Sequence, residues 1–443
     1  MHLCLSPISR DGARSNRGGG MYGWENAQSL TGVGLAMAVC WALSEDRRRF
    51  PWKLAIGAIL LQLALILLLF GAPATRSVVQ GLDDAVAALG GATAQGVQFV
   101  FGYLGGGQQP YAIANSGALF IFAFDVLPLI IVISALSALL WHWKVLQWVM
   151  RGFEVVFRKT LGIGGISAFY AAIDIFLGNV ECALVIKGYL PKLTRAELFL
   201  MATTGMATMA GSTMVAYATL LKDTIPNAAA HVIAASIISA PAGILLARIM
   251  VAEPKGHRYE KTDYDDLLKY RSTIDALSTG IGSGLQIALN VGATLIVFVA
   301  LIALANSVLG LLPHAAGDPM SVQRILGFVF SPLAWTLGVP WKEASAAGNL
   351  LGVKLVVTEL IALADLAKEP ELSLRTRLIM TYALCSFANI GSVGIISSGF
   401  GVLMPDRRHE INGMIWKALL AGFLSTIMTG ALIGALPGSL FGV

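Results

Sequence analysis

The chain has 443 residues, of which 56% are apolar and only 13% charged, about half the charged fraction of an ordinary soluble domain. Its mean hydropathy of +0.72 requires a bilayer rather than water as the solvent for so much apolar surface. The net charge of +5 does not indicate a nucleic-acid-binding protein, because the basic residues lie in short gaps between apolar runs rather than in one patch or arm.

Residues 1–28 are polar and are expected to form a disordered leader. They contain Arg10, Arg14, Arg17 and a run of three glycines, and they lack the apolar core and cleavage site of a signal peptide. After them no low-complexity linker divides the chain, so residues 29–443 are predicted to form one domain. The four cysteines show no CxxC or Cys/His ligand spacing, and we therefore expect no disulfide, metal centre or cofactor.

Eight apolar runs predict membrane-spanning helices and therefore an all-α membrane protein. They are residues 29–43, 52–72, 119–143, 198–221, 228–251, 277–308, 374–404 and 411–436. The first run is short for a span. Residues 81–107 begin with Asp83-Asp84 and end in glycine-rich turns, and they are expected to be an extracytoplasmic loop with a surface helix.

Two further apolar stretches carry charged residues in their interior. Residues 166–190 contain Asp174 and Glu181, and residues 344–366 contain Lys354 and Glu359. Each is about one span long and rich in Gly and Ala. Irregular backbone at membrane depth is tolerated only where it is buried in protein or lines a cavity, so both stretches are predicted to be re-entrant helical hairpins.

The two hairpins belong to an internal repeat of hairpin, broken helix and helix. Its landmarks keep nearly the same spacing: Leu161-Gly162, Glu181 and Gly211-Ser212 in residues 144–251, and Leu337-Gly338, Glu359 and Gly391-Ser392 in residues 321–443. One span, 277–308, separates the copies, which makes them inverted in the membrane. Inverted repeats are typical of transporters that bind their cargo near the midplane. Residues 29–143 and 277–308 would then form a scaffold for the repeated unit.

The distribution of lysine and arginine predicts an orientation. With the N-terminus outside, most of the 31 basic residues fall on the cytoplasmic side, as expected for a multi-pass inner-membrane protein.

The buried acids are the first candidate site residues, because a carboxylate at membrane depth costs about 2.5–3.5 kcal/mol unless it faces a cavity or a partner. Glu359 either binds cargo or pairs with Lys354, and Glu181 either binds cargo or pairs with Lys187. Asp174 either takes part in ion coupling or forms a salt bridge with a basic residue.

Polar residues of the second broken helix are further candidates. Asn389 and Ser392 are spaced i, i+3 and would share a helix face if the helix persists, where they either bind cargo or make contacts between helices. Phe387 either stacks on a ligand or packs.

At these residues the sequence resembles the bacterial, eight-span type of concentrative nucleoside transporter. The segments are FAFDVLP (122–128), GNVE (178–181), ATMAGS (207–212), HVIAAS (231–236) with SAPA (239–242), LGVK (351–354) and FANIGS (387–392). The resemblance implies a homotrimer in the bacterial inner membrane. It also implies an elevator-like movement of the repeated unit and uptake of nucleosides driven by Na⁺ or H⁺.

The resemblance also implies a substrate site. The family's base-recognising Gly-Gln-Thr-Glu corresponds to Gly178, Asn179, Val180 and Glu181, in which the middle two residues are changed. Its ribose-binding residues correspond to Thr358, Glu359, Phe387, Asn389 and Ser392, in which only the Asn before the Glu is changed. Asn179 and Val180 weaken the polar match, so the cargo is either a nucleoside or a related polar compound.

A cation site follows from the same resemblance. The family's Asn and Ser ligands correspond to Asp174 and Ser212, with carbonyl groups from Leu177 and Thr213. Asp174 is the largest departure, since a carboxylate binds Na⁺ more tightly than an amide or carries the proton itself.

Two other functions compete with the transporter interpretation. An intramembrane enzyme would use Asp174, Glu181 or Glu359 as acid or base, but no paired carboxylates, Ser/His set or HExxH motif accompany them. A channel or scaffold would not need broken helices with polar tips.

Overall fold

The computed structural model describes residues 23–71, 75–111, 121–254, 269–311 and 319–442, apart from the side chains of Arg76, Val78, Val180, Glu181 and Leu184. Within these residues the regular structure is helical, with no strand, which confirms the predicted all-α class. The α-helices are α1 (Trp24–Ala42), α2 (Trp52–Ile66), α3 (Arg76–Phe101), α4 (Phe122–Asp125), α5 (Leu127–His142), α6 (Val145–Leu161), α7 (Gly165–Asp174), α8 (Asn179–Val185), α9 (Arg195–Ala207), α10 (Gly211–Leu221), α11 (Ala228–Met250), α12 (Thr273–Leu309), α13 (Val322–Thr336), α14 (Trp341–Val356), α15 (Glu359–Lys368), α16 (Leu374–Leu384), α17 (Ile390–Leu403) and α18 (Arg408–Ala435).

Seven helical segments in the described residues are long and apolar enough to cross a membrane, or eight if the sharply bent pair α13–α14 counts as one span. They are 52–71, 79–105, 122–142, 195–221, 228–250, 273–309 and 405–435. Six of the eight predicted spans are among them, within a few residues. The chain is therefore a multi-pass membrane protein.

Three boundaries differ from the sequence prediction. α1 begins at Trp24, inside the predicted leader, and the side chain of Asn26 in its first turn accepts a hydrogen bond from the backbone N of Gly23. Residues 1–22 lie outside the described part of the chain. The segment 81–107, expected to be a loop with a surface helix, is helical for most of its length, because α3 runs unbroken to Phe101. The predicted span 374–404 is two helices, α16 and α17, separated by residues 385–389.

The described residues show the same order of elements twice, α6 to α11 and α13 to α18. Each set begins with a helix that ends at a glycine in the left-handed conformation, Gly162 (φ 63°) and Gly338 (φ 87°), where a Cβ would be strained. Two helices follow where each hairpin was predicted, then a helix in two pieces, then a long helix. Hydroxyl caps start both broken helices: Thr194 accepts from the N of Glu197, and Ser373 accepts from the N of Thr376.

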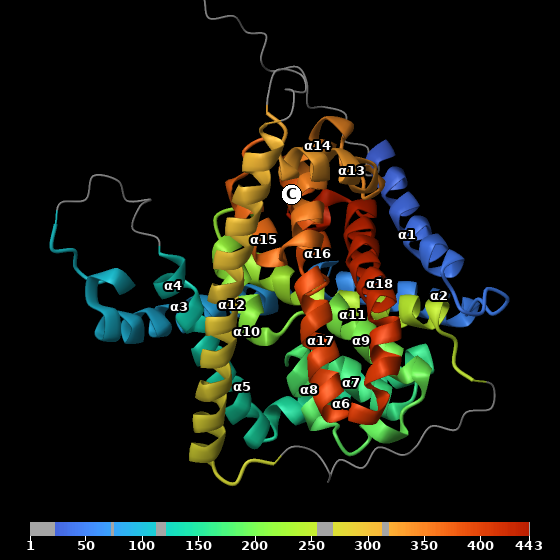
Figure 1. Ribbon diagram of the computed structural model, residues 1–443, viewed down its shortest axis with the longest axis horizontal. Helices are drawn as coiled ribbons and strands as arrows, with labels where there is room; N and C mark the ends of the chain where they lie inside the picture. The colour runs from blue at the N-terminus through green and yellow to red at the C-terminus, as the bar shows by residue number, and fades with distance from the viewer. Residues whose placement is uncertain (1–22, 72–74, 112–120, 255–268, 312–318, 443) are drawn as a thin grey trace, which may run out of the picture.

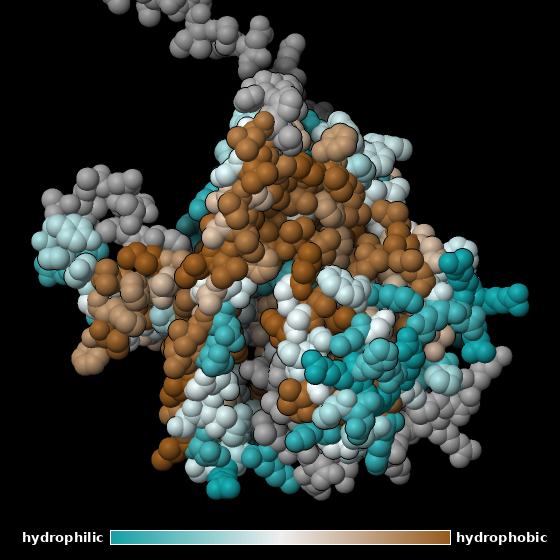
Figure 2. Space-filling view, viewed as in Figure 1, coloured by the Kyte–Doolittle hydropathy of each residue, from teal (hydrophilic) through white to brown (hydrophobic). Residues whose placement is uncertain are grey.

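The repeated helices form the core of the molecule. The spans formed by α9–α10, α11 and α18 are about nine-tenths buried, at 89%, 94% and 89%. By contrast, α12 is 37 residues long with only 6% of its most apolar window buried, and it runs nearly the full height of the molecule in Figure 1. It packs on α5 through Gly280 and Gly284, where a Cβ would come within 2.7 Å of the α5 backbone. Apolar side chains cover much of the visible face, including the ridge formed by α12 (Figure 2).

Candidate functional site

The two broken helices meet at their breaks. Residues 208–210 separate α9 from α10, and residues 385–389 separate α16 from α17. The backbone N of Phe387 donates a hydrogen bond of 3.1 Å to the carbonyl oxygen of Thr208. A break frees backbone donors and acceptors that a continuous helix would use internally. Here the freed groups of one copy of the repeat bind those of the other.

The turn between α7 and α8 docks on the first break. The N of Gly211 donates to the carbonyl of Phe176 at 2.9 Å, and the hydroxyl of Thr208 donates to Oδ2 of Asp174 at 2.9 Å. A Cβ on Gly211 would lie 2.9 Å from the Phe176 carbonyl, so only glycine allows this approach. The Gly-Ser pair therefore marks a contact between the first hairpin and the break.

Asp174 is a buried carboxylate with one free oxygen. Its side chain is 1% exposed, and Oδ1 accepts no hydrogen bond, although the thiol of Cys182 lies near the carboxylate. The alternative of a salt bridge is not realised, since no Lys or Arg of the described residues lies within ion-pair distance of Asp174. A buried carboxylate that lacks a cation is costly, and the free oxygen is the place where a cation or a proton would reduce that cost.

The other predicted cation ligands lie in the two segments that meet at this junction, the turn after α7 and the start of α10. Ser212 and Thr213 are buried in the first turn of α10, directly after the break, and the hydroxyl of Thr213 donates to the carbonyl of Ala210 at 2.8 Å. Leu177 lies in the turn between α7 and α8. These positions are adjacent in sequence to the Asp174–Thr208 and Phe176–Gly211 contacts, although no hydrogen bond joins any two of the four predicted ligands.

Glu359 is the second buried carboxylate, and both its oxygens accept from neutral donors. The hydroxyl of Tyr217 donates to Oε1 at 2.7 Å, and Nδ2 of Asn389 donates to Oε2 at 2.7 Å. Glu359 is 3% exposed and stands at the first position of α15. The alternative of an ion pair with Lys354 is not realised, because the ammonium group binds other partners. A ligand with two hydroxyl groups could replace the two donors on this carboxylate.

Asn389 caps the helix that follows the second break. Its Oδ1 accepts from the backbone N of Ser392 at 2.9 Å and from the hydroxyl of Ser392 at 3.1 Å. The condition for the shared helix face, a continuous helix, is not met: Asn389 has extended backbone and lies before α17, and the i, i+3 spacing reflects an N-cap. Phe387 is half-buried within the break. Thr358 precedes Glu359 as the N-cap of α15 but makes no side-chain cap bond.

The predicted base-recognition residues lie at the start of α8. Gly178 precedes the helix, and Asn179 is buried with its Oδ1 unbonded. The side chain of Asn179 lies against Gly205 of α9, where a Cβ would overlap that oxygen. The side chains of Val180 and Glu181 lie outside the described residues, so the alternative of a Glu181–Lys187 pair stays open. α8 packs against α17, which brings the first hairpin to the second broken helix.

Sequence reasoning missed Tyr217 and Thr208. Both contact predicted carboxylates from positions more than 30 residues away in the chain. A local signal existed for Tyr217, because it follows Thr213 by four residues on α10 and so faces the same side. Thr208 stands in the ATMAGS segment, next to the predicted break.

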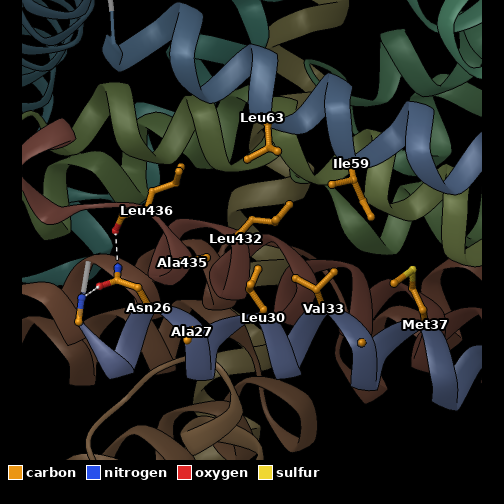
Figure 3. Close-up of a pocket in the computed structure, with 12 residues that line it drawn as sticks. Asn26, Ala27, Leu30, Val33, Met37, Ile59, Leu63, Leu432, Ala435 and Leu436 are labelled. Carbon is orange, nitrogen blue, oxygen red and sulfur yellow. Dashed lines mark hydrogen bonds between the residues drawn. The ribbon is translucent and has the colours of Figure 1, made fainter. Parts of the chain in front are cut away.

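An apolar groove between α1, α2 and α18 is not part of this site. It encloses about 580 Å³, and Leu30, Val33, Ile59 and Leu63 point into it (Figure 3). Its one polar lining side chain, Asn26, donates to the carbonyls of Gly434 and Leu436 at 2.9 Å and is satisfied by them. The groove therefore offers apolar contact and no polar recognition.

Three family models match the chain. Residues 31–104 match the N-terminal part of Na⁺-dependent nucleoside transporters, residues 231–434 match the C-terminal part, and residues 123–224 match a nucleoside-recognition domain.

Full-length relatives and solved structures agree with these matches. The chain is 37% identical to the uncharacterized transporter YutK of Bacillus subtilis, over 91% of this chain and 98% of YutK. It is 33% identical to the nucleoside permease NupC of Helicobacter pylori, over 93% and 97%. The structure of CNTnw in an inward-facing, substrate-bound state superposes with a TM-score of 0.83 at 35% identity, covering 92% of this chain and 98% of CNTnw.

Proposed function

Because the chain belongs to the family of concentrative, Na⁺-dependent nucleoside transporters, we propose that it imports nucleosides together with a cation. The family consists of membrane transporters and not of enzymes, which removes the acid–base enzyme alternative. The observation that carries the proposal is the Glu359 carboxylate at the crossing of the two breaks, held by Tyr217 and Asn389.

The ribose is the part of the substrate that this carboxylate would bind. Its two adjacent hydroxyls can each donate to one oxygen of Glu359 in place of Tyr217 and Asn389, a charge-assisted arrangement. Asn389 and Ser392 would then bind the sugar from the start of α17, and Phe387 and Thr358 would contact it from the break and from the N-cap of α15.

The base would lie toward the start of α8, between Gly178 and Glu181. Asn179 turns toward Gly205 and Val180 has no hydroxyl, so Glu181 would be the main polar group for the base. The same two residues favour the second candidate function, transport of a different polar cargo by the same fold. A pocket that loses hydrogen-bonding groups loses discrimination between cargoes.

The coupling cation would bind at Asp174. Its free Oδ1 would bind Na⁺ together with Ser212 and the carbonyls of Leu177 and Thr213, or would accept a proton. The family match supports Na⁺ as the coupling ion. H⁺ is the alternative, because a carboxylate stands here in place of the family's amide and can accept a proton.

The transport movement would carry the repeated unit against a scaffold. Residues 144–251 and 321–443 would move together, because the bond between Phe387 and Thr208 joins their breaks. Residues 29–143 and 277–308 would form the scaffold of a homotrimer in the bacterial inner membrane, with the N-terminus outside. The exposed apolar face of α12 supports contact with lipid or with other subunits.

Uptake into proteoliposomes tests the proposal. Labelled uridine, adenosine and guanosine would be offered under a Na⁺ gradient and, separately, a proton gradient, with Glu359→Gln beside the wild type. We expect uptake under one of the two gradients, reduced at least 30-fold in kcat/KM by Glu359→Gln, since two charge-assisted bonds weaken by about 1 kcal/mol or more each. Folded, inserted protein that takes up no nucleoside under either gradient would refute it.

A further inference from the structure

Lys354 is a buried lysine that the proposed function leaves unused. It lies on α14 with none of its side chain exposed. Its Nζ donates to the carbonyl of Ala383 at 2.7 Å and to the hydroxyl of Thr426 at 2.7 Å, and it stands 5.3 Å from the ring centre of Phe423. Among the residues that the structure describes, no carboxylate lies within ion-pair distance of this ammonium group. A charged side chain is expensive at such a position, which calls for an explanation beyond packing.

The carbonyl that Lys354 binds is one that the break in the helix leaves without its usual partner. In a continuous helix Ala383 would accept from the N of Phe387, four residues on. Here the N of Phe387 donates across to Thr208. Lys354 therefore supplies the hydrogen bond that the crossing of the two breaks removes. A cation at this end of α16 is also favoured by the helix dipole.

Lys354 is also the positive charge available to Glu359. The two residues attract each other electrostatically without forming a contact pair. Because the ammonium group is held by Ala383 and Thr426, both oxygens of Glu359 stay free for neutral donors. The second hairpin thus carries a positive charge near Glu359, whereas no Lys or Arg of the described residues lies within ion-pair distance of Asp174 in the first copy.

We propose that the ammonium group of Lys354 is a permanent positive charge of the transport site. It would play at Glu359 the part that the transported cation plays at Asp174. It is a positioning residue: it keeps the second break open by binding Ala383, and it balances the charge of Glu359 while leaving that carboxylate unpaired. This inference rests on the proposed function, because it assigns Glu359 to the cargo and Asp174 to the mobile cation.

Three variants separate charge from shape. Lys354→Met keeps the length and removes the charge, Lys354→Arg keeps the charge, and Lys354→Ala leaves space for an added amine. Lys342→Met, at the exposed start of the same helix, is the matched control. Uptake under a Na⁺ gradient would be measured as kcat and KM. Propylammonium or tetramethylammonium would be present equally on both sides of the membrane.

We expect Lys354→Met to fold but lose at least tenfold in kcat/KM, Lys354→Arg to recover part of it, and the control to match the wild type. Propylammonium, which has N–H donors, should raise the uptake of Lys354→Ala severalfold, whereas tetramethylammonium, which has none, should not. Wild-type rates in Lys354→Met, or equal loss in Met and Arg variants without rescue, would overturn the proposal.

A measurement without cargo keeps this inference separate from the proposed function. Propylammonium should raise the thermal unfolding temperature of Lys354→Ala and leave the wild type unchanged, whether or not nucleosides are transported. If propylammonium does not selectively stabilise Lys354→Ala, the proposed role of Lys354 is refuted. If it is present but no nucleoside is taken up, the cargo assignment alone fails.

Discussion

Replacing Asp174 by asparagine tests the cation site without any cargo. The carboxylate is buried, has one unbonded oxygen, and has no Lys or Arg of the described part of the chain within ion-pair distance. Burying such a charge at membrane depth costs about 2.5–3.5 kcal/mol. Asparagine removes that cost and weakens the bond from Thr208 by about 1 kcal/mol. Without Na⁺, the variant should therefore be more stable than the wild type by about 1.5–2.5 kcal/mol.

Na⁺ should reverse the order of stability, so that the wild type becomes more stable than Asp174→Asn. A cation bound only by the folded protein stabilises it by about 2.7 kcal/mol at a hundred times its Kd. The wild type should gain this stability as NaCl replaces choline chloride at constant ionic strength, and Asp174→Asn should gain much less. If the coupling ion is H⁺, acid should stabilise the wild type in place of Na⁺.

Thermal unfolding in detergent, followed in both salts and over a range of pH, is the assay. Asp223→Asn, an exposed residue after α10, is the control and should change neither stability nor ion response. The reasoning would be refuted by a wild type that responds to neither ion, together with an Asn variant that is less stable in choline.

Two further predictions concern the hairpin contact and a surface cluster. Gly211→Ala should push the Phe176 carbonyl away and weaken Na⁺ binding at least tenfold, whereas Gly391→Ala, with only Asn389 Oδ1 at 3.2 Å, should have a smaller effect in the same titration. Arg195 lies 2.9 Å from Glu45 and holds the pKa of that carboxyl below its usual value. The pair therefore stabilises the protein at neutral pH, and this stabilisation is lost as the pH falls through the lowered pKa. The unfolding temperature of Glu45→Gln should be slightly below that of the wild type at pH 7 and equal to it in acid; a gap that persists in acid would contradict this.

Much of the fold could be predicted because it depends on local patterns. Apolar length marks most spans, and a Leu-Gly pair marks the end of α6 and of α13. The Gly-Ser pairs mark the breaks, because Gly211 is the residue that allows the hairpin to approach. The helix at 81–107 is longer than the surface helix expected within a loop there, because glycines interrupt the apolar pattern without interrupting α3.

The site could be predicted only in part, because its contacts join residues distant in the chain. Glu359 and Asn389 were identified, but their bond to each other and to Tyr217 depends on how three helices cross. The i, i+3 spacing of Asn389 and Ser392 was assigned to a helix face, whereas a cap produces the same spacing. The partners of Lys354 could not be read from the sequence, since they lie on α16 and α18.

Because α12 is so long, its tilt is expected to depend on the thickness of the bilayer. Its 37 residues extend over about 55 Å, whereas a typical hydrocarbon core is about 30 Å thick. The helix must tilt or carry its ends beyond the apolar layer, and its angle then changes with the lipids around it. Since α12 closely approaches the backbone of α5 at Gly280 and Gly284, a change in its tilt would displace α5 as well. Lipids with longer or shorter acyl chains would thus reset the geometry of the helices that support the site.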